Sequence, residues 1–193
     1  MPSPPIGYDT VLAAGGARHH RTELLQAWIA TPTWDQSANF LQEHNAELAN
    51  THTRDLLASY SDDDACQRHL AILYLADNKP VEEVYQIVTD TTVATEHALD
   101  LIESADLNQL ALVLAAAPKA AKGITGAFIQ TAIALATGNH DAARRLAELI
   151  AEHGNPSQRE AFAIRLQAFA SHQPDPAPAL DVADLIAPET RQT

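Results

Sequence analysis

Cysteine, basic residues and long apolar runs are scarce in this 193-residue chain, and each scarcity excludes a class of protein. The one cysteine, Cys66, cannot form a disulfide within the chain, which fits the reducing cytoplasm where we expect the protein. Lys and Arg number 12 against 25 Asp and Glu, and the net charge of −13 argues against binding to nucleic acid or anionic membranes. No run reaches about 18 apolar residues, so we expect no membrane span, and no signal peptide is expected either.

Aromatic residues make up only 5% of the chain, whereas alanine, the best helix former, is abundant. Apolar residues recur at helical spacing: Val81, Val84, Tyr85 and Val88 stand at i, i+3, i+4 and i+7. No segment alternates with a period of two over a useful length. The sequence therefore predicts an all-α protein whose short connections make neighbouring helices antiparallel.

Local signals mark helix ends and set the expected domain boundaries. Thr33 precedes Gln36 by three residues, which is the spacing of a capping box. Asn139, directly after Gly138, is a second predicted helix cap. Prolines and glycines crowd both ends of the chain. The expected parts are a flexible arm at 1–17, a helical-repeat domain at 18–172, and a Pro-rich tail at 173–193 that could hold a short helix.

Two segments, 70–88 and 129–150, each read as a helix, a tight polar turn and an amphipathic helix. This is the unit of a tetratricopeptide-like solenoid, a right-handed stack of antiparallel helix pairs. Gly138, Ala143 and Pro156 resemble the Gly, Ala and Pro positions of that repeat. The early Trp and the Leu-Gly pair of the repeat are missing, so an irregular helical bundle is the alternative fold.

A further resemblance covers roughly residues 22–88. The residues that carry it are Thr33-Trp34-Asp35-Gln36, Phe40-Leu41, His44, Leu48, His69-Leu70-Ala71-Ile72-Leu73 and Val84-Tyr85. They resemble a pattern in actinobacterial helical-repeat proteins, in which such regions often flank a CHAT protease domain, a caspase relative. The resemblance implies a helical interaction region. It does not imply catalysis, because no residues here match a protease motif.

Cys66 and His69 stand three residues apart on one predicted helix, so a nucleophilic Cys–His pair is conceivable. Nothing in the sequence resembles an oxyanion loop. Catalytic pairs also usually come from separate elements. We therefore expect Cys66 to be a buried apolar residue and His69 to lie on the flank of the helix.

The chain shows no metal-binding motif, although it contains nine histidines. Glu96, Asp100 and Glu103 share a helical face beside His97, but a di-metal site would need a second Glu-x-x-His helix. The acidic run at 62–64 could bind Ca²⁺, and it also suits a helix N-terminus. The sequence thus predicts no catalytic, cofactor or metal site.

Acidic residues crowd one stretch of the chain. From Asp77 to Asp106, eight acids accompany one base, Lys79, whereas from Pro118 to Arg165 six bases accompany four acids. Like charges at i, i+4 repel by a few tenths of a kcal/mol, and a basic partner would relieve this repulsion. The alternative is a solvated surface. The predicted partner-binding residues are Glu82, Glu83, Glu96, Asp100 and Glu103.

From these patterns we expect a non-enzymatic helical-repeat adaptor or regulator that binds a protein or peptide partner, with a basic partner favoured by charge. One alternative is a small-molecule-binding protein, or an enzyme, with a pocket between helices. Another is a regulatory domain of transcription that acts through partner proteins. The sequence predicts no cofactor and leaves the oligomeric state open.

Overall fold

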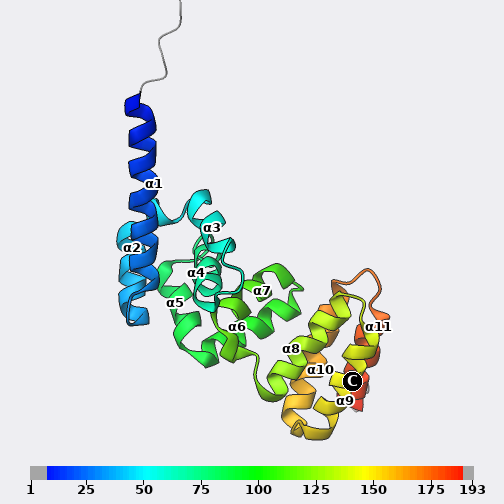
Figure 1. Cartoon of the computed structure of the whole chain (residues 1–193). Helices are drawn as coiled ribbons and strands as arrows, with labels where there is room; N and C mark the ends of the chain where they lie inside the picture. The colour runs from blue at the N-terminus through cyan, green and yellow to red at the C-terminus, as the bar shows by residue number, and fades with distance from the viewer. Residues whose placement is uncertain (1–7, 189–193) are drawn as a thin grey trace, which may run out of the picture. The chain divides into compact units, whose positions relative to one another are not determined.

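The computed structural model describes residues 8–188, which form eleven α-helices and one short 3₁₀ segment, with no strand in that range (Figure 1). The prediction of an all-α protein is confirmed, whereas the stacking of helix pairs into a solenoid stays a prediction. Within 8–188, no helix is both long enough and apolar enough to span a membrane. The helical-repeat domain expected at 18–172 stays a prediction, and the chain divides into two compact units, Met1–Tyr85 and Gln86–Thr193.

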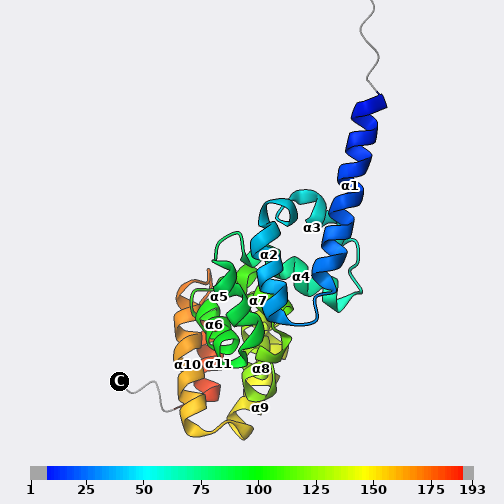
Figure 2. The same cartoon turned by 90° about the vertical axis from the view of Figure 1, so that its left-hand side faces the viewer.

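The first unit contains four helices and the start of a fifth. They are α1 (Tyr8–Ile29), α2 (Trp34–Leu48), α3 (Thr51–Ala58), α4 (Asp64–Leu75) and α5 (Val81–Thr89). Helix α1 packs against α2, and α3 packs against α4 (Figure 2). Residues 8–17, expected as a flexible arm, belong to α1, and the rest of that arm lies outside the described residues.

Side-chain caps begin three helices of this unit, α2, α3 and α4. The Thr33 hydroxyl accepts a hydrogen bond from the Gln36 N–H at 3.3 Å. Asp63, from the acidic run, accepts one from the Cys66 N–H at 2.9 Å. Each cap satisfies a backbone donor that has no partner within its own helix. The acidic run therefore marks the N-terminus of α4.

The core of the first unit is built on Trp28, which is 0% exposed. Its indole Nε1–H is shared between the Ser37 carbonyl oxygen and the Tyr85 hydroxyl, each 3.2 Å away. The same hydroxyl lies 2.8 Å from Ser37 Oγ. Residues of α1, α2 and α5 thus meet at one buried polar contact. Fully buried aliphatic side chains of the unit include Leu41, Leu48, Leu57, Ile72, Leu73, Leu75 and Val84.

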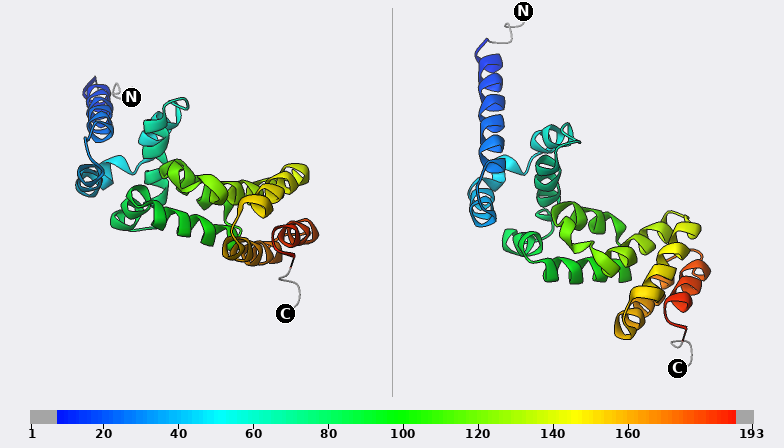
Figure 3. Two further views of the ribbon diagram at one scale, coloured as in Figure 1. Left: turned by 90° about the horizontal axis from the view of Figure 1, so that it is seen from below. Right: turned by 60° about the horizontal axis from the view of Figure 1, so that its bottom comes forward.

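The second unit contains the remaining helices. They are α6 (Thr91–Glu103), α7 (Leu107–Ala116), η1 (Pro118–Ala120), α8 (Gly123–Ala136), α9 (His140–His153), α10 (Pro156–Ser171) and α11 (Ala177–Ile186). Helix α8 packs against α9, α10 against α11, and α11 also against α9 (Figure 3). Helix α11 falls in the segment expected as a tail, yet it is packed into the unit through Ala179, Val182, Ala183 and Ile186.

Two tight turns of the second unit have the same construction. Gly138 (φ +73°) and Ala105 (φ +55°) each follow a helix in the left-handed region. The next residues, Asn139 and Asp106, donate their N–H groups back to carbonyls five residues earlier, as in a Schellman motif. Asn139 and Asp106 then cap the following helices, α9 and α7. The chain therefore reverses within a few residues at both places.

Aromatic packing joins α8 to α10 in the core of the second unit. The rings of Phe128 and Phe162 stack with centroids 4.3 Å apart and planes 6° from parallel. Phe169 is fully buried on the same helix as Phe162. Leu166, predicted to face inward with these two phenylalanines, is also fully buried. The face of α10 expected from the sequence is thus the face that packs.

Candidate partner-binding surface

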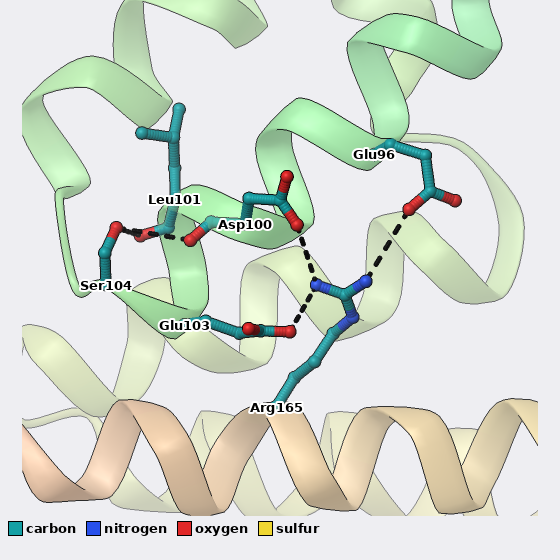
Figure 4. A network of polar contacts seen from close by, with 6 residues as sticks. All are labelled: Glu96, Asp100, Leu101, Glu103, Ser104 and Arg165. Carbon is teal, nitrogen blue, oxygen red and sulfur yellow. Dashed lines mark hydrogen bonds and ion pairs between the residues drawn. The ribbon is translucent and has the colours of Figure 1, made fainter.

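Three carboxylates of α6 gather around one guanidinium of α10 (Figure 4). Glu96, Asp100 and Glu103 stand at i, i+4 and i+7, so they share one face of α6. Arg165 Nη2 lies 3.6 Å from Glu96 Oε2, and Arg165 Nη1 lies 3.3 Å from Asp100 Oδ1 and 2.5 Å from Glu103 Oε1. Helix α6 contains no Lys or Arg. The guanidinium comes from α10, more than 60 residues further along the chain. We call these four residues the α6 acidic cluster.

The α6 acidic cluster stays negative and open to water despite Arg165. The side chains of Glu96 and Asp100 are 63% and 67% exposed, whereas that of Arg165 is 19% exposed. One guanidinium balances one of three carboxylates, so two negative charges remain at the surface. Exposed ion pairs contribute about 0.2–1 kcal/mol each, so the cluster links α6 to α10 only weakly. Its residual charge can still attract a cation from solution.

The other two predicted partner-binding residues, Glu82 and Glu83, lie on α5 and belong to the first unit. Each has a local contact. Gln42 Nε2 donates to Glu82 Oε1 at 2.6 Å, and Glu83 forms an ion pair with Lys79 one turn earlier. The structure thus brings three of the five predicted residues together around Arg165 and gives the other two separate partners.

A groove runs between α9 and α11, and Leu135 of α8 also lines it. It has a volume of about 590 Å³. We call it the α9–α11 groove, and its lining residues are Leu135, His140, Asp141, Arg144, Pro178, Asp181, Val182, Asp184 and Leu185. Sequence reasoning missed this groove because it depends on α11 packing against α9, which the Pro-rich segment before α11 did not indicate.

The α9–α11 groove continues into a second hollow of about 250 Å³. The two hollows share Leu135, His140 and Pro178, so they adjoin. The second one extends to the α10–α11 connection, where Pro174 and Asp175 line it. Together their linings follow α11 from Pro178 to Leu185 and reach back to Pro174 in the connection before it.

Cys66 is buried, as the sequence predicts. Burial raises the pKa of its thiol because the thiolate would lose solvation, and the nearby Asp63 carboxylate raises it further. The pKa of Asp63 is lowered, chiefly because its carboxylate accepts the Cys66 N–H. A nucleophilic cysteine requires a lowered pKa. The electrostatics around Cys66 therefore disfavour the thiolate.

His69 does not lie on the helix flank as expected: it is 4% exposed. Its ring packs edge-on against Trp28, with centroids 4.5 Å apart, and lies 5.9 Å from the ring of Trp34. The prediction failed because α4 is covered by α1 and α2 on this side, which the periodicity of α4 alone could not show. The ring Nδ1 lies 2.8 Å from the Ala65 carbonyl oxygen, so Nδ1 carries the proton and donates it.

The other ring nitrogen of His69, Nε2, is buried and has no hydrogen-bond partner in the described part of the chain. Burial lowers the pKa of His69 because the imidazolium would lose solvation, and the Ala65 carbonyl offsets this only in part. The charged groups nearby are Arg68, which also lowers the pKa, and Asp63, which raises it. The two tryptophans that cover the ring carry no charge. His69 is therefore neutral in the folded protein at neutral pH.

The stability of the first unit should fall as the pH drops below about 6.5, the pKa of histidine in an unfolded chain. Below that pH the unfolded chain binds a proton on His69 that the folded chain does not accept until its lower pKa is reached. The slope from one such group is at most about 1.4 kcal/mol per pH unit. Urea unfolding between pH 7.5 and 5, followed by tryptophan fluorescence, measures it, because both tryptophans lie in this unit.

A His69→Asn variant removes the titrating group, and its side-chain amide can still donate to Ala65. Its stability should depend less on pH than that of the wild type. His52→Asn, at an exposed position of the same unit, is the matched control and should keep the wild-type slope. Equal slopes for His69→Asn and the wild type would contradict the assignment.

Within residues 8–188, no group of three or more His, Cys, Asp or Glu is placed to bind a metal ion. Glu96, Asp100 and Glu103, which raised the question of a di-metal site, have the guanidinium of Arg165 among them instead. A fixed positive charge at that place opposes a metal cation.

Arg165 is the member of the α6 acidic cluster that sequence reasoning did not single out. It directly precedes the buried Leu166 and follows the buried Phe162 by three residues, so it stands at the margin of the packed face of α10. That register shows that Arg165 borders another helix. It does not show that the other helix is α6, because no local pattern links residues 62 positions apart.

Comparison with known protein families, with curated proteins and with solved structures found no match to this chain. The tetratricopeptide-like pattern and the resemblance to regions that flank CHAT protease domains therefore stay predictions from the sequence.

Proposed function

We propose that this chain is a non-enzymatic helical adaptor that binds a protein or peptide partner on its second unit. The observation that carries the proposal is the elongated α9–α11 groove and its adjoining hollow. A depression that follows a helix suits a chain-like ligand better than a compact metabolite. The groove is open and mixes apolar with charged side chains, which is typical of protein-binding surfaces.

The α6 acidic cluster has a separate part in this proposal: it speeds the encounter with a basic partner. Exposed charges act mainly on association rates, and salt screens them over about 8 Å at physiological ionic strength. Glu82 and Glu83, exposed on α5, belong to the first unit, and their role in partner binding stays a prediction from the sequence. For Glu96, Asp100 and Glu103 we propose only this effect on the association rate and no direct contact in the bound complex.

Neutralising Glu96→Gln and Asp100→Asn should slow association with a basic partner and weaken its salt dependence. This double variant leaves Glu103 paired with Arg165, so the α6–α10 contact is preserved. The partner is first identified by affinity purification and mass spectrometry from the native host, and rates are then measured at low and high salt. The matched control neutralises two exposed acids elsewhere in the second unit, Glu152→Gln and Glu160→Gln.

If the double variant has the same association rate and salt dependence as the control, the α6 acidic cluster is only a solvated surface. If the chain purified by affinity from its native host carries no protein or peptide in stoichiometric amount, the adaptor function itself is contradicted. The two results are separate, because the first concerns only how fast a partner arrives.

The second candidate function, binding of a small molecule, is favoured by one observation. The volume of about 590 Å³ lies within the range of ligand pockets, roughly 300–1,000 Å³. A metabolite that fills the groove should raise the melting temperature in a saturable manner, because it binds only the folded state. An adaptor that binds a segment of a protein or peptide should show no such rise with small metabolites.

A further inference from the structure

We propose that the α9–α11 groove holds a cationic amphipathic segment of the partner protein, in which an apolar side chain is flanked by Lys or Arg. This inference rests on the proposed function and specifies the chemistry of the partner. It follows from three features of the groove: the charge of its walls, the character of its floor and its length.

The walls of the groove carry an excess of carboxylates. Asp141 on α9 and Asp181 on α11 are both exposed, and neither side-chain carboxylate has a hydrogen bond or ion pair among the described residues. Asp184 adds a third carboxylate. The lining contains one arginine, Arg144. Its side chain is 73% exposed, and its Nε lies 3.8 Å from Glu148 Oε1. A ligand that brings Lys or Arg to these walls gains attraction from both sides of the groove.

The floor of the groove is apolar. It is formed by Leu135, Val182 and Leu185, of which the first two are buried and Leu185 is half-buried. A hydrated inorganic cation would make no use of this floor. The aliphatic stems of Lys and Arg pack on apolar surface while their charged ends stay in water, and a Leu or Ile between them would cover the remainder.

The length of the groove fits a chain segment. Its α11 side runs from Pro178 to Leu185, which is seven residues apart and about 10 Å along a helix. That distance matches two turns of a bound helix or about three residues of an extended strand. The adjoining hollow near Pro174 lengthens the path further. A single amine or amino acid would leave most of it empty.

The test uses two synthetic, fluorescein-labelled peptides of fourteen residues that differ only in their apolar positions. Both carry the same number of lysines. One has leucine at i, i+3, i+4 and i+7, and the other has serine there. Fluorescence anisotropy with the full chain should show that the leucine peptide binds at least about tenfold more tightly than the serine peptide, because only leucine uses the floor.

Two variants locate the binding. The double reversal Asp141→Lys and Asp181→Lys should weaken binding of the leucine peptide at least about tenfold, because it replaces attraction by repulsion at both walls. Leu185→Ala should weaken binding of the leucine peptide severalfold and leave the affinity for the serine peptide unchanged. The matched control, Glu152→Lys with Glu160→Lys, makes the same change in net charge at exposed positions outside the groove and should have less than about twofold effect.

Equal binding of the two peptides, or equal loss in the groove variant and its control, would overturn the proposal. So would saturable stabilisation by spermine together with no binding of either peptide, since that result assigns the groove to a small amine. If a natural partner binds the groove variant as tightly as the wild type, the adaptor function stands and the groove assignment fails. If the wild type has no protein partner at all, the proposed function fails instead.

Discussion

Replacing Trp28 with alanine should destabilise the first unit by about 3–5 kcal/mol, which is the range for truncating a buried aromatic residue. The indole is fully buried. It packs against His69 and shares its N–H between Ser37 and Tyr85. Alanine would remove these contacts from three helices at once. It would leave a cavity that the surrounding helices can fill only by moving.

Urea unfolding measures this loss, with the fluorescence of Trp34 and the far-UV ellipticity as the two signals. Trp28→Phe is the companion variant, because it keeps most of the buried area and removes only the N–H donor and part of the ring. It should cost less, about 1–3 kcal/mol. A Trp28→Ala protein whose free energy of unfolding stays within about 1 kcal/mol of the wild type would show that the polar contact does not organise this unit.

Gly126→Ala should destabilise the second unit by about 1–3 kcal/mol, which is the cost of forcing an extra carbon into a packed site. Helix propensity alone predicts the opposite, since alanine is favoured over glycine within a helix by about 1 kcal/mol. A Cβ at position 126 would overlap the carbonyl oxygen of Ala121 and lie 2.7 Å from its carbonyl carbon. Both are backbone atoms, so the clash cannot be relieved by turning a side chain.

The loss is measured as the change in the free energy of unfolding followed by far-UV ellipticity. Gln130→Ala, at an exposed position of the same helix, is the control. It should change stability by no more than about 0.5 kcal/mol. A Gly126→Ala protein as stable as this control, or more stable, would mean that α8 begins differently from the structure described here.

Helix ends could be predicted from the sequence because each depends on residues within one turn of the chain. The Thr33 cap, the Asn139 cap and the acidic start of α4 all form between residues three positions apart. Helical periodicity predicts the inward faces of α4 and α10 in the same way, and Cys66 and Phe162 on those faces are buried. Such signals are unaffected by how the helices later pack.

Contacts between helices could not be predicted, because they join residues that no local pattern connects. Arg165 meets Glu103 across 62 positions, and Trp28 meets Tyr85 across 57. His69 is buried because α1 and α2 cover a side of α4 that its own residues do not mark as apolar. In each case the sequence determined which face of a helix is apolar or charged, whereas the packing decided what lies opposite that face.

The α9–α11 groove also depends partly on the sequence alone and partly on how the helices pack. The sequence by itself determined that Asp181 and Asp184 stand near Val182 and Leu185 in a segment able to form a helix. Only the tertiary structure decided that this helix lies against α9, so that its carboxylates border an apolar floor. The physical reason is that a helix forms from bonds between neighbours in the chain, whereas a groove exists only where two separately formed helices leave space between their side chains.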